Sequence, residues 1–234
     1  MGRNDDDSRS VGVPDGFVPE ALRSPLRARS RSARARKGQY ILSEGAPSTD
    51  VYFIVNGMVQ FSLISSLGRE TILRNMGDGQ LFGELAAIDG QPRSVNAIAL
   101  RDSELAVLTA ADFRDFVAAV PAAGLWLAEL LAARVRDLTA KTFELATMPV
   151  ANRLQGELLR MCDALGQWDA GGDVCTIDNF PIHAELAARI GTHREAVSRE
   201  LSQLAQEGII AQMRRTLRVV SVARLRAIYA RTAR

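Results

Sequence analysis

The sequence predicts an α+β protein in which a β-rich first half precedes a long helix and a helical last third. Between Gly38 and Leu108, short runs of Val, Ile, Phe, Tyr and Leu alternate with turn residues at a spacing of about 8–12 residues, as in an all-β sandwich or roll. From Ala110 the apolar period becomes that of a helix. A loop rich in glycine and aspartate and a second set of helical segments follow.

Charge divides the chain in a similar way. The net charge of the 234 residues is only +2, but residues 180–234 carry ten arginines against four glutamates. Residues 38–149 carry eight basic and thirteen acidic side chains. A near-neutral chain with a basic final third is typical of a DNA-reading module joined to a module that does not bind DNA.

Residues 1–30 are predicted to form a polar tail, disordered in its early part around the acidic run Asp5–Asp7. The arginine-rich stretch Arg23–Arg36 fits a solvated tail or a short surface helix, with contact to DNA or RNA as the alternative. No apolar run approaches the roughly 18 residues that span a bilayer, and the start lacks the pattern of a signal peptide. We therefore expect a cytoplasmic protein with no membrane partner.

A short segment between two predicted strands carries the residue types of an anion site. Gly83 opens a turn, Glu84 follows it, and the chain reverses at Asp89–Pro92, which should return Arg93 and Ser94 toward the turn. Backbone N–H groups at a helix start and a guanidinium suit a phosphate, whereas a carboxylate needs a neutral donor such as a sugar hydroxyl. The segment predicts a nucleotide site. The alternative is a surface ion pair between Glu84 and Arg93, which would be worth little.

The helix expected after Pro121 carries an apolar seam. No further proline occurs before Pro149. A seam at alternating four- and three-residue steps is typical of a helix that pairs with another helix, although one face could instead pack on the β-rich domain. The seam consists of Leu131, Val135, Leu138, Thr142 and Leu145.

The basic last third has the spacing of a helix-turn-helix. Ala187 is small enough for two helices to cross closely, Gly191 four residues later suits the turn, and Val197 six residues further fills the angle between the helices. Two short apolar runs, 208–213 and 217–220, then flank Arg214–Thr216. They predict a β-hairpin wing beside the helices.

The nucleotide segment resembles the phosphate-binding cassette of cyclic-nucleotide-binding domains. From about residue 30 to 225 the chain is similar to the cyclic AMP receptor protein and fumarate–nitrate regulator (CRP/FNR) superfamily of bacterial transcription factors. The resemblance implies a β jelly roll over 31–120, a dimerisation helix over 121–148 and a winged helix-turn-helix domain over 149–234, after the tail of residues 1–30.

The resemblance also implies roles for the pocket residues. Glu84 would hold the ribose 2′-hydroxyl, while Arg93, Ser94 and the backbone N–H groups around Gly83 and Leu85 would hold the cyclic phosphate. The expected effector is cyclic AMP or cyclic GMP.

Contacts to the base are implied on a neighbouring strand and on the long helix. Alignment through Arg153 places Thr139 where a hydroxyl of the second subunit meets the purine. It places Leu138 where cyclic AMP receptors usually carry threonine and Arg74 where they carry serine. An arginine can face guanine O6 and N7, so cyclic GMP competes with cyclic AMP as the effector; the alternative for Arg74 is a solvated strand residue.

DNA reading is assigned to the second helix of the helix-turn-helix. The family's Arg-Glu-x-x-x-Arg pattern is present at 194–199 and implies a half-site close to TGTGA, with TTGAT as the alternative. Thr192 is expected to cap this helix, and Arg215 on the wing to meet a phosphate. The predicted DNA-binding residues are Thr192, His193, Arg194, Glu195, Ser198, Arg199 and Arg215.

The expected protein is a homodimeric, nucleotide-responsive regulator that binds double-stranded operator DNA and acts with RNA polymerase. The alternative is a regulator with a vestigial pocket that binds DNA constitutively. No catalytic residues are expected, because a phosphodiesterase using Glu84 and Arg93 would lack a metal cluster and a nearby histidine base. No metal site is expected either, because the spacing of Cys162 and Cys175 fits no zinc or iron–sulfur pattern and both histidines lie in the DNA-binding third.

Overall fold

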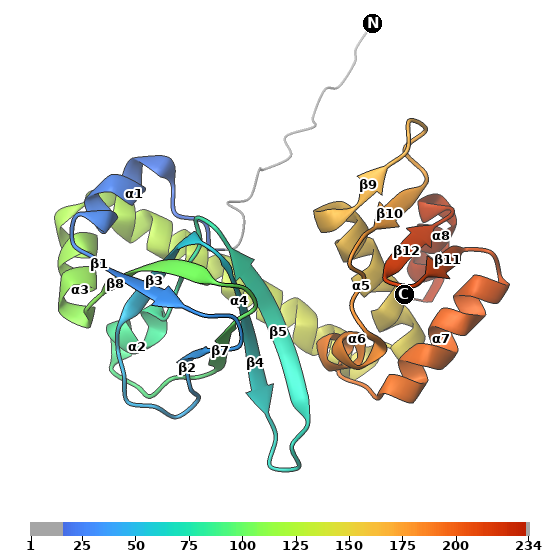
Figure 1. The fold of residues 1–234 in the computed structure, drawn as a ribbon, viewed down its shortest axis with the longest axis horizontal. Helices are drawn as coiled ribbons and strands as arrows, with labels where there is room; N and C mark the ends of the chain where they lie inside the picture. The colour runs from blue at the N-terminus through green and yellow to red at the C-terminus, as the bar shows by residue number, and fades with distance from the viewer. Residues whose placement is uncertain (1–15, 233–234) are drawn as a thin grey trace, which may run out of the picture. The chain divides into compact units, whose positions relative to one another are not determined.

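The computed structural model describes residues 16–232 (Figure 1). Its residues form two compact units. The first unit contains the chain up to Leu63 together with Arg74–Asp137, and the second contains Ile64–Leu73 together with the chain from Leu138 onward.

The first unit is built on two four-stranded sheets, ordered β1–β8–β3–β6 and β2–β7–β4–β5. Side chains from both sheets, among them Ile54, Phe61 and Phe82, share one buried cluster, so the sheets face each other across a common core. This arrangement confirms the predicted β roll. The strands are β1 (Arg31–Ala35), β2 (Tyr40–Leu42), β3 (Val51–Asn56), β4 (Met58–Ile64), β5 (Glu70–Gly77), β6 (Leu81–Phe82), β7 (Asn96–Ala99) and β8 (Ser103–Leu108).

Helices cover the other face of the first sheet. Strand residues alternate between the two faces, so Phe53 joins a second cluster while its neighbour Ile54 belongs to the first. The second cluster takes Phe113 and Phe116 from α3 (Ala110–Ala119) and Trp126 from α4 (Pro121–Thr147). The side chains of α4 that pack here are Ala123, Trp126, Leu127 and Leu130.

The predicted tail is wrong from residue 16 onward. Residues Glu20–Arg27 form the helix α1, which buries Leu22 and Leu26, four residues apart, in the cluster on the sheet. The preceding Phe17 accepts a hydrogen bond at its carbonyl from Trp126 Nε1, 2.8 Å away. This segment therefore belongs to the folded unit, whereas the predicted disorder around Asp5–Asp7 lies outside the described residues.

The long helix divides into a packed part and an exposed part. Its first turns lie on the sheet, and of the seam residues Leu131 packs beside them. Further along, the middle of the seam is uncovered in a single chain, with Val135 62% and Leu138 56% exposed. Within residues 16–232 no single helix is long and apolar enough to cross a membrane; only α3 and α4 taken together, bent by 112°, would be.

The second unit is a helical domain with a small sheet ordered β11–β12–β10–β9, and it confirms the winged helix-turn-helix. Its core contains Leu154, Phe180, Val197 and Leu217. Its elements are α5 (Val150–Leu165), β9 (Gln167–Trp168), β10 (Cys175–Ile177), α6 (His183–Ile190), α7 (Arg194–Gln206), β11 (Ile210–Met213), β12 (Thr216–Val219) and α8 (Val222–Thr232).

Both cysteines lie in this core as free thiols. Burial, and a hydrogen bond with Cys175, raise the pKa of the Cys162 thiol well above its usual value. Because the thiolate is the reactive and metal-binding form, Cys162 is a structural residue at neutral pH. Among the described residues, no group of three or more His, Cys, Asp or Glu side chains is placed to hold a metal ion.

Candidate functional site

A glycine starts the predicted nucleotide segment. The short helix α2 (Glu84–Asp89) begins after Gly83, whose φ of 84° lies in the left-handed region. A Cβ on Gly83 would lie 2.9 Å from the carbonyl oxygen of Asp50 and 3.1 Å from Nη1 of Arg93. Both the backbone conformation and the close approach of Arg93 therefore require glycine here.

The chain reversal after α2 brings Arg93 back to Gly83, as the sequence predicted. Arg93 is 4% exposed, and its guanidinium donates to Ser48 Oγ (2.9 Å), the Gly83 carbonyl (2.9 Å) and the Asp50 carbonyl (2.7 Å). A guanidinium has five N–H groups, so these three bonds orient it and leave two for a ligand. Burial lowers the pKa of Arg93, while the charges of Tyr52, Asp50 and Glu84 act in the opposite direction.

The carboxylate of Glu84 is buried, with 1% of the residue exposed. Its Oε1 pairs with Arg134 Nη1 from α4, and Arg134 Nη2 also donates to the Leu81 carbonyl at 3.1 Å. The alternative prediction, a surface ion pair between Glu84 and Arg93, is therefore wrong: Glu84 is buried, and its ion-pair partner is Arg134. The second carboxylate oxygen, Oε2, is buried without a hydrogen-bond partner among the described residues.

Arg134 is the residue that the sequence analysis missed. It lies fifty residues after Glu84, on the helix whose apolar seam alone was used in the prediction. Its position four residues before Leu138, already assigned to the pocket by resemblance, was the available signal, because residues four apart share one face of a helix.

The other predicted pocket residues are more accessible. Ser94 and Leu85 are exposed beside Arg93 and Glu84, and Arg74 is half-buried on β5. Leu138 and Thr139 are exposed on α4, one turn beyond Arg134.

The predicted helix-turn-helix consists of α6 and α7. Gly191 ends α6 in the left-handed conformation (φ 64°), and both Ala187 and Val197 are buried between the helices. The prediction that Thr192 caps the second helix is wrong: α7 begins at Arg194, His193 is the residue before it, and no side chain caps its first turn.

Most of the side chains predicted to read DNA are exposed at the start of α7, whereas Thr192 and Ser198 are half-buried. His193, Arg194, Glu195 and Arg199 are exposed. Ser198 is half-buried, and its hydroxyl bonds the Arg194 carbonyl at 3.0 Å and His183 Nδ1 at 2.7 Å. These bonds make Ser198 part of the helix packing rather than a free base contact.

The predicted wing is the hairpin of β11 and β12, with Arg214 and Arg215 at its turn. Arg214 has a φ of 52°. Arg215 is exposed, and its carbonyl accepts from the Phe180 N–H at 2.7 Å, so its backbone is anchored while its side chain is not.

Both halves of the chain match known families. Residues 33–119 match the family described as cyclic nucleotide-binding domain, and residues 152–228 match the Crp-like helix-turn-helix domain. The cyclic AMP receptor protein of Thermus thermophilus is 33% identical over 197 residues, which cover 83% of this chain and 86% of that protein. The chain belongs to the CRP/FNR superfamily of transcription regulators.

Two further relatives extend this result. The CRP-like cAMP-activated global transcriptional regulator of Mycobacterium tuberculosis is 27% identical over 200 residues, 86% of this chain and 88% of that protein. A solved CRP/FNR-family transcriptional regulator from Thermus thermophilus has 26% identity and a TM-score of 0.65, covering 86% of this chain and 98% of its own. This superfamily member is therefore a DNA-binding regulator of the cyclic-nucleotide-binding type and not an enzyme.

Proposed function

We propose that this CRP/FNR protein is a homodimeric transcription regulator switched by a cyclic nucleotide. The unpartnered Glu84 Oε2 carries the proposal, because a buried carboxylate oxygen without a donor is costly unless a ligand supplies one. The 2′-hydroxyl of a ribose is such a donor. The two remaining N–H groups of Arg93, together with Ser94 and the backbone around Gly83 and Leu85, would hold the cyclic phosphate.

The proposed dimer uses the exposed seam of α4. Val135 and Leu138 lie on this seam and are uncovered in a single chain, which favours a partner helix. In such a dimer, Thr139 of the partner subunit would complete the contact to the base. Binding at this place would favour one arrangement of the recognition helices and so couple the pocket to DNA.

The operator we propose is a pseudo-palindrome of TGTGA-like half-sites, with centres about one helical turn apart. Arg194 and Arg199 would contact guanines, and Glu195 a cytosine. The alternative half-site is TTGAT. Transcription would then be regulated through RNA polymerase, which is the expected partner of a regulator in this superfamily.

Calorimetric titration with cyclic AMP and with cyclic GMP tests the effector. Binding of either nucleotide, together with tighter operator binding in its presence, supports the proposal. If neither nucleotide binds and the operator is bound equally well without them, the pocket is vestigial and the protein binds DNA constitutively.

The choice between the two nucleotides depends on Arg74. If its guanidinium faces the base, Arg74→Ser weakens cyclic GMP binding more than cyclic AMP binding. Equal effects on the two titrations would instead make Arg74 a solvated strand residue. Arg69→Ser, a change at the exposed hairpin turn that precedes β5, is the control and should leave both affinities unchanged.

A further inference from the structure

The chain contains only two lysines, Lys37 and Lys141, among its 29 basic residues. Lys37 is exposed in the turn that precedes β2. Lys141 is half-buried on the part of α4 that belongs to the second unit. A lysine amine is a nucleophile only in its unprotonated form, so surroundings that disfavour the ammonium charge make it reactive. The two lysines therefore offer a comparison of reactivity within one chain.

The surroundings of Lys141 disfavour its positive charge. Burial of the amine and the nearby charge of Arg160 lower its pKa, and the charge of Arg153 adds to this effect. The carboxylates of Glu157 and Glu144 act in the opposite direction, but both are bonded to Arg160, at 3.1 and 2.7 Å. Lys141 itself forms no side-chain hydrogen bond or ion pair with any residue between 16 and 232. Its amine is therefore less protonated than that of an ordinary lysine.

A second cation without an ion pair, Arg153 of α5, lies on the same side of α4. A Cβ on Gly191 would lie 2.8 Å from Leu145 Cδ2 and 3.7 Å from Arg153 Nη1. Leu145 follows Lys141 by four residues, so both lie on one face of α4. Nε of Arg153 is buried without a hydrogen-bond partner, and its side chain pairs with no carboxylate in the described part of the chain. Its guanidinium is therefore available to an anion that enters beside Lys141.

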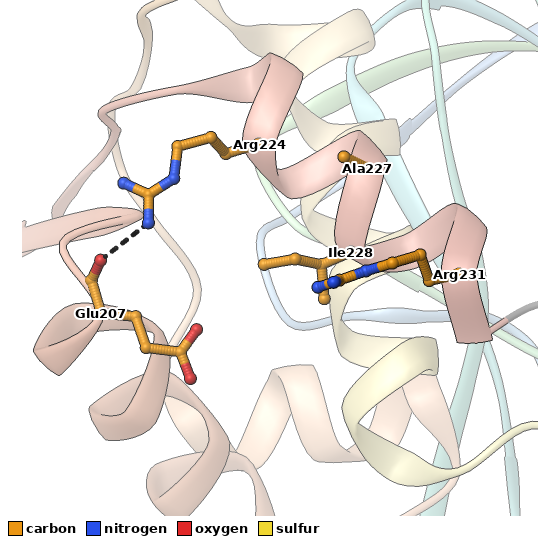
Figure 2. A pocket seen from close by; sticks show the side chains of 5 residues that line it. All are labelled: Glu207, Arg224, Ala227, Ile228 and Arg231. Carbon is orange, nitrogen blue, oxygen red and sulfur yellow. Dashed lines mark hydrogen bonds between the residues drawn. The ribbon is translucent and has the colours of Figure 1, made fainter.

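A charged hollow elsewhere in the second unit shows the contrast. Figure 2 shows Glu207, just after α7, facing Arg224, Ala227, Ile228 and Arg231 of α8 around a hollow of about 640 Å³. Its basic residues are arginines, whose guanidinium groups stay protonated in proteins and so supply no nucleophile. This hollow therefore lacks the group that Lys141 supplies beside Arg153.

We propose that Lys141 is a modification site for acyl phosphates and that Arg153 holds the phosphate of the incoming molecule. The lone pair of Lys141 Nζ attacks the carbonyl carbon and forms a C–N bond. The bond between this carbon and the phosphate oxygen breaks, and phosphate leaves with the electron pair and with the proton that the nitrogen gives up. The product is an uncharged amide at position 141, and the reaction requires neither a bound nucleotide nor DNA.

Incubation of the full chain with acetyl phosphate at pH 7.5 tests the site, with the acetylated fraction of each lysine followed over time by peptide mass spectrometry. We expect Lys141 to be acetylated at least about threefold faster than Lys37, because a lower pKa leaves a larger fraction of the amine unprotonated. Inorganic phosphate, added at constant ionic strength, should slow the reaction of Lys141 because it competes for Arg153. It should leave the reaction of Lys37 unchanged.

Arg153→Gln separates the phosphate contact from the reactivity of the amine. With acetyl phosphate the variant should acetylate Lys141 more slowly than the wild type, and with the N-hydroxysuccinimide ester of acetic acid, which carries no phosphate, the two proteins should differ less. Arg36→Gln, at an exposed position beside Lys37, is the control and should leave the reaction of Lys141 unchanged. Acetylation of Lys37 as fast as that of Lys141, or no slowing of Lys141 by inorganic phosphate, would overturn the inference. An equal effect of Arg153→Gln with both reagents would overturn the role of Arg153.

Discussion

The nucleotide pocket and the DNA-reading face of this regulator hold their arginines in opposite ways. Arg93 is buried and bonded to two carbonyls and a hydroxyl, whereas Arg199 is exposed and pairs with its neighbour Glu200 at 3.3 Å. Removing a buried, bonded arginine should lower both the stability of its domain and the affinity for the ligand. Removing an exposed arginine should lower the affinity alone. The two regions should therefore respond differently when the same kind of side chain is removed.

The largest effect is expected for Arg93→Leu. The change removes the guanidinium proposed for the phosphate, and with it the hydrogen bonds that Arg93 donates to the part-buried carbonyls of Gly83 and Asp50. We expect nucleotide binding to be lost and the free energy of unfolding to fall by about 3 kcal/mol. Calorimetry and urea denaturation measure the two effects.

Arg69→Leu, at the exposed turn between β4 and β5, is the control for this change. It should alter neither measurement. An Arg93→Leu protein with the wild-type nucleotide affinity would remove Arg93 from the pocket.

Arg199→Ala should separate binding from stability. Loss of one bidentate contact to guanine costs about 1–3 kcal/mol of operator affinity and relaxes the preference at one base pair. The melting temperature should stay close to that of the wild type, because an exposed side chain is removed. Titration against the operator and its single-base variants measures the effect, and an equal loss on every sequence would show that this arginine contacts the backbone.

A smaller and different loss is expected for Arg215→Ala on the wing. A phosphate contact carries no sequence information, so the affinity for all DNA sequences should fall alike. The slope of log affinity against log salt should become shallower by about one unit. Titrations at several salt concentrations measure this slope, and a loss confined to one base pair would contradict the assignment.

The smallest effect, on the melting temperature, is expected at Asp173, a carboxylate near the surface that accepts two hydrogen bonds. Hydrogen bonds from the Ala223 N–H (2.7 Å) and the Ser221 hydroxyl (2.8 Å) lower the pKa of Asp173 below its usual value. These bonds to the Asp173 carboxylate therefore stabilise the folded protein fully at pH values above the unfolded-state pKa, near 3.9. The stabilisation is lost as the pH falls through the lower folded-state pKa. Asp173→Asn should slightly lower the melting temperature at pH 7, and the difference from wild type should shrink in acid. A difference that grows as the pH falls would contradict this sign.

Sequence patterns were sufficient for the elements whose period is regular. The alternating strands, the seam of α4 and the spacing of Ala187, Gly191 and Val197 are local patterns, and they predicted the roll and the helix-turn-helix. The helix α1 was less visible, because Pro25 interrupts it and four of its eight residues are charged or proline. Its signal is the pair Leu22 and Leu26, which share one face.

The parts of the sites that the sequence did not reveal depend on contacts between distant segments. The pairing of Arg134 with Glu84 joins two segments fifty residues apart, and its only local signal is the four-residue spacing between Arg134 and Leu138. The partner of Ser198 is His183 on another helix, so a residue that looked free to meet a base is bonded instead. Thr192 was expected to cap α7, but the residue before the helix is His193, and no side chain bonds the first N–H groups of α7.

The last turn of α4 belongs structurally to the DNA-binding domain. Leu145 lies against the turn of the helix-turn-helix so closely that a Cβ on Gly191 would come within 2.8 Å of its Cδ2. Glu144, beside it, is bonded to Arg160 of α5 at 2.7 Å. A chimera that exchanges DNA-binding domains at Pro149 would separate these partners and leave the turn uncovered. The second compact unit takes in the long helix from Leu138 onward, so the helix segment proposed to contact the nucleotide and the segment that supports the DNA reader belong to the same unit.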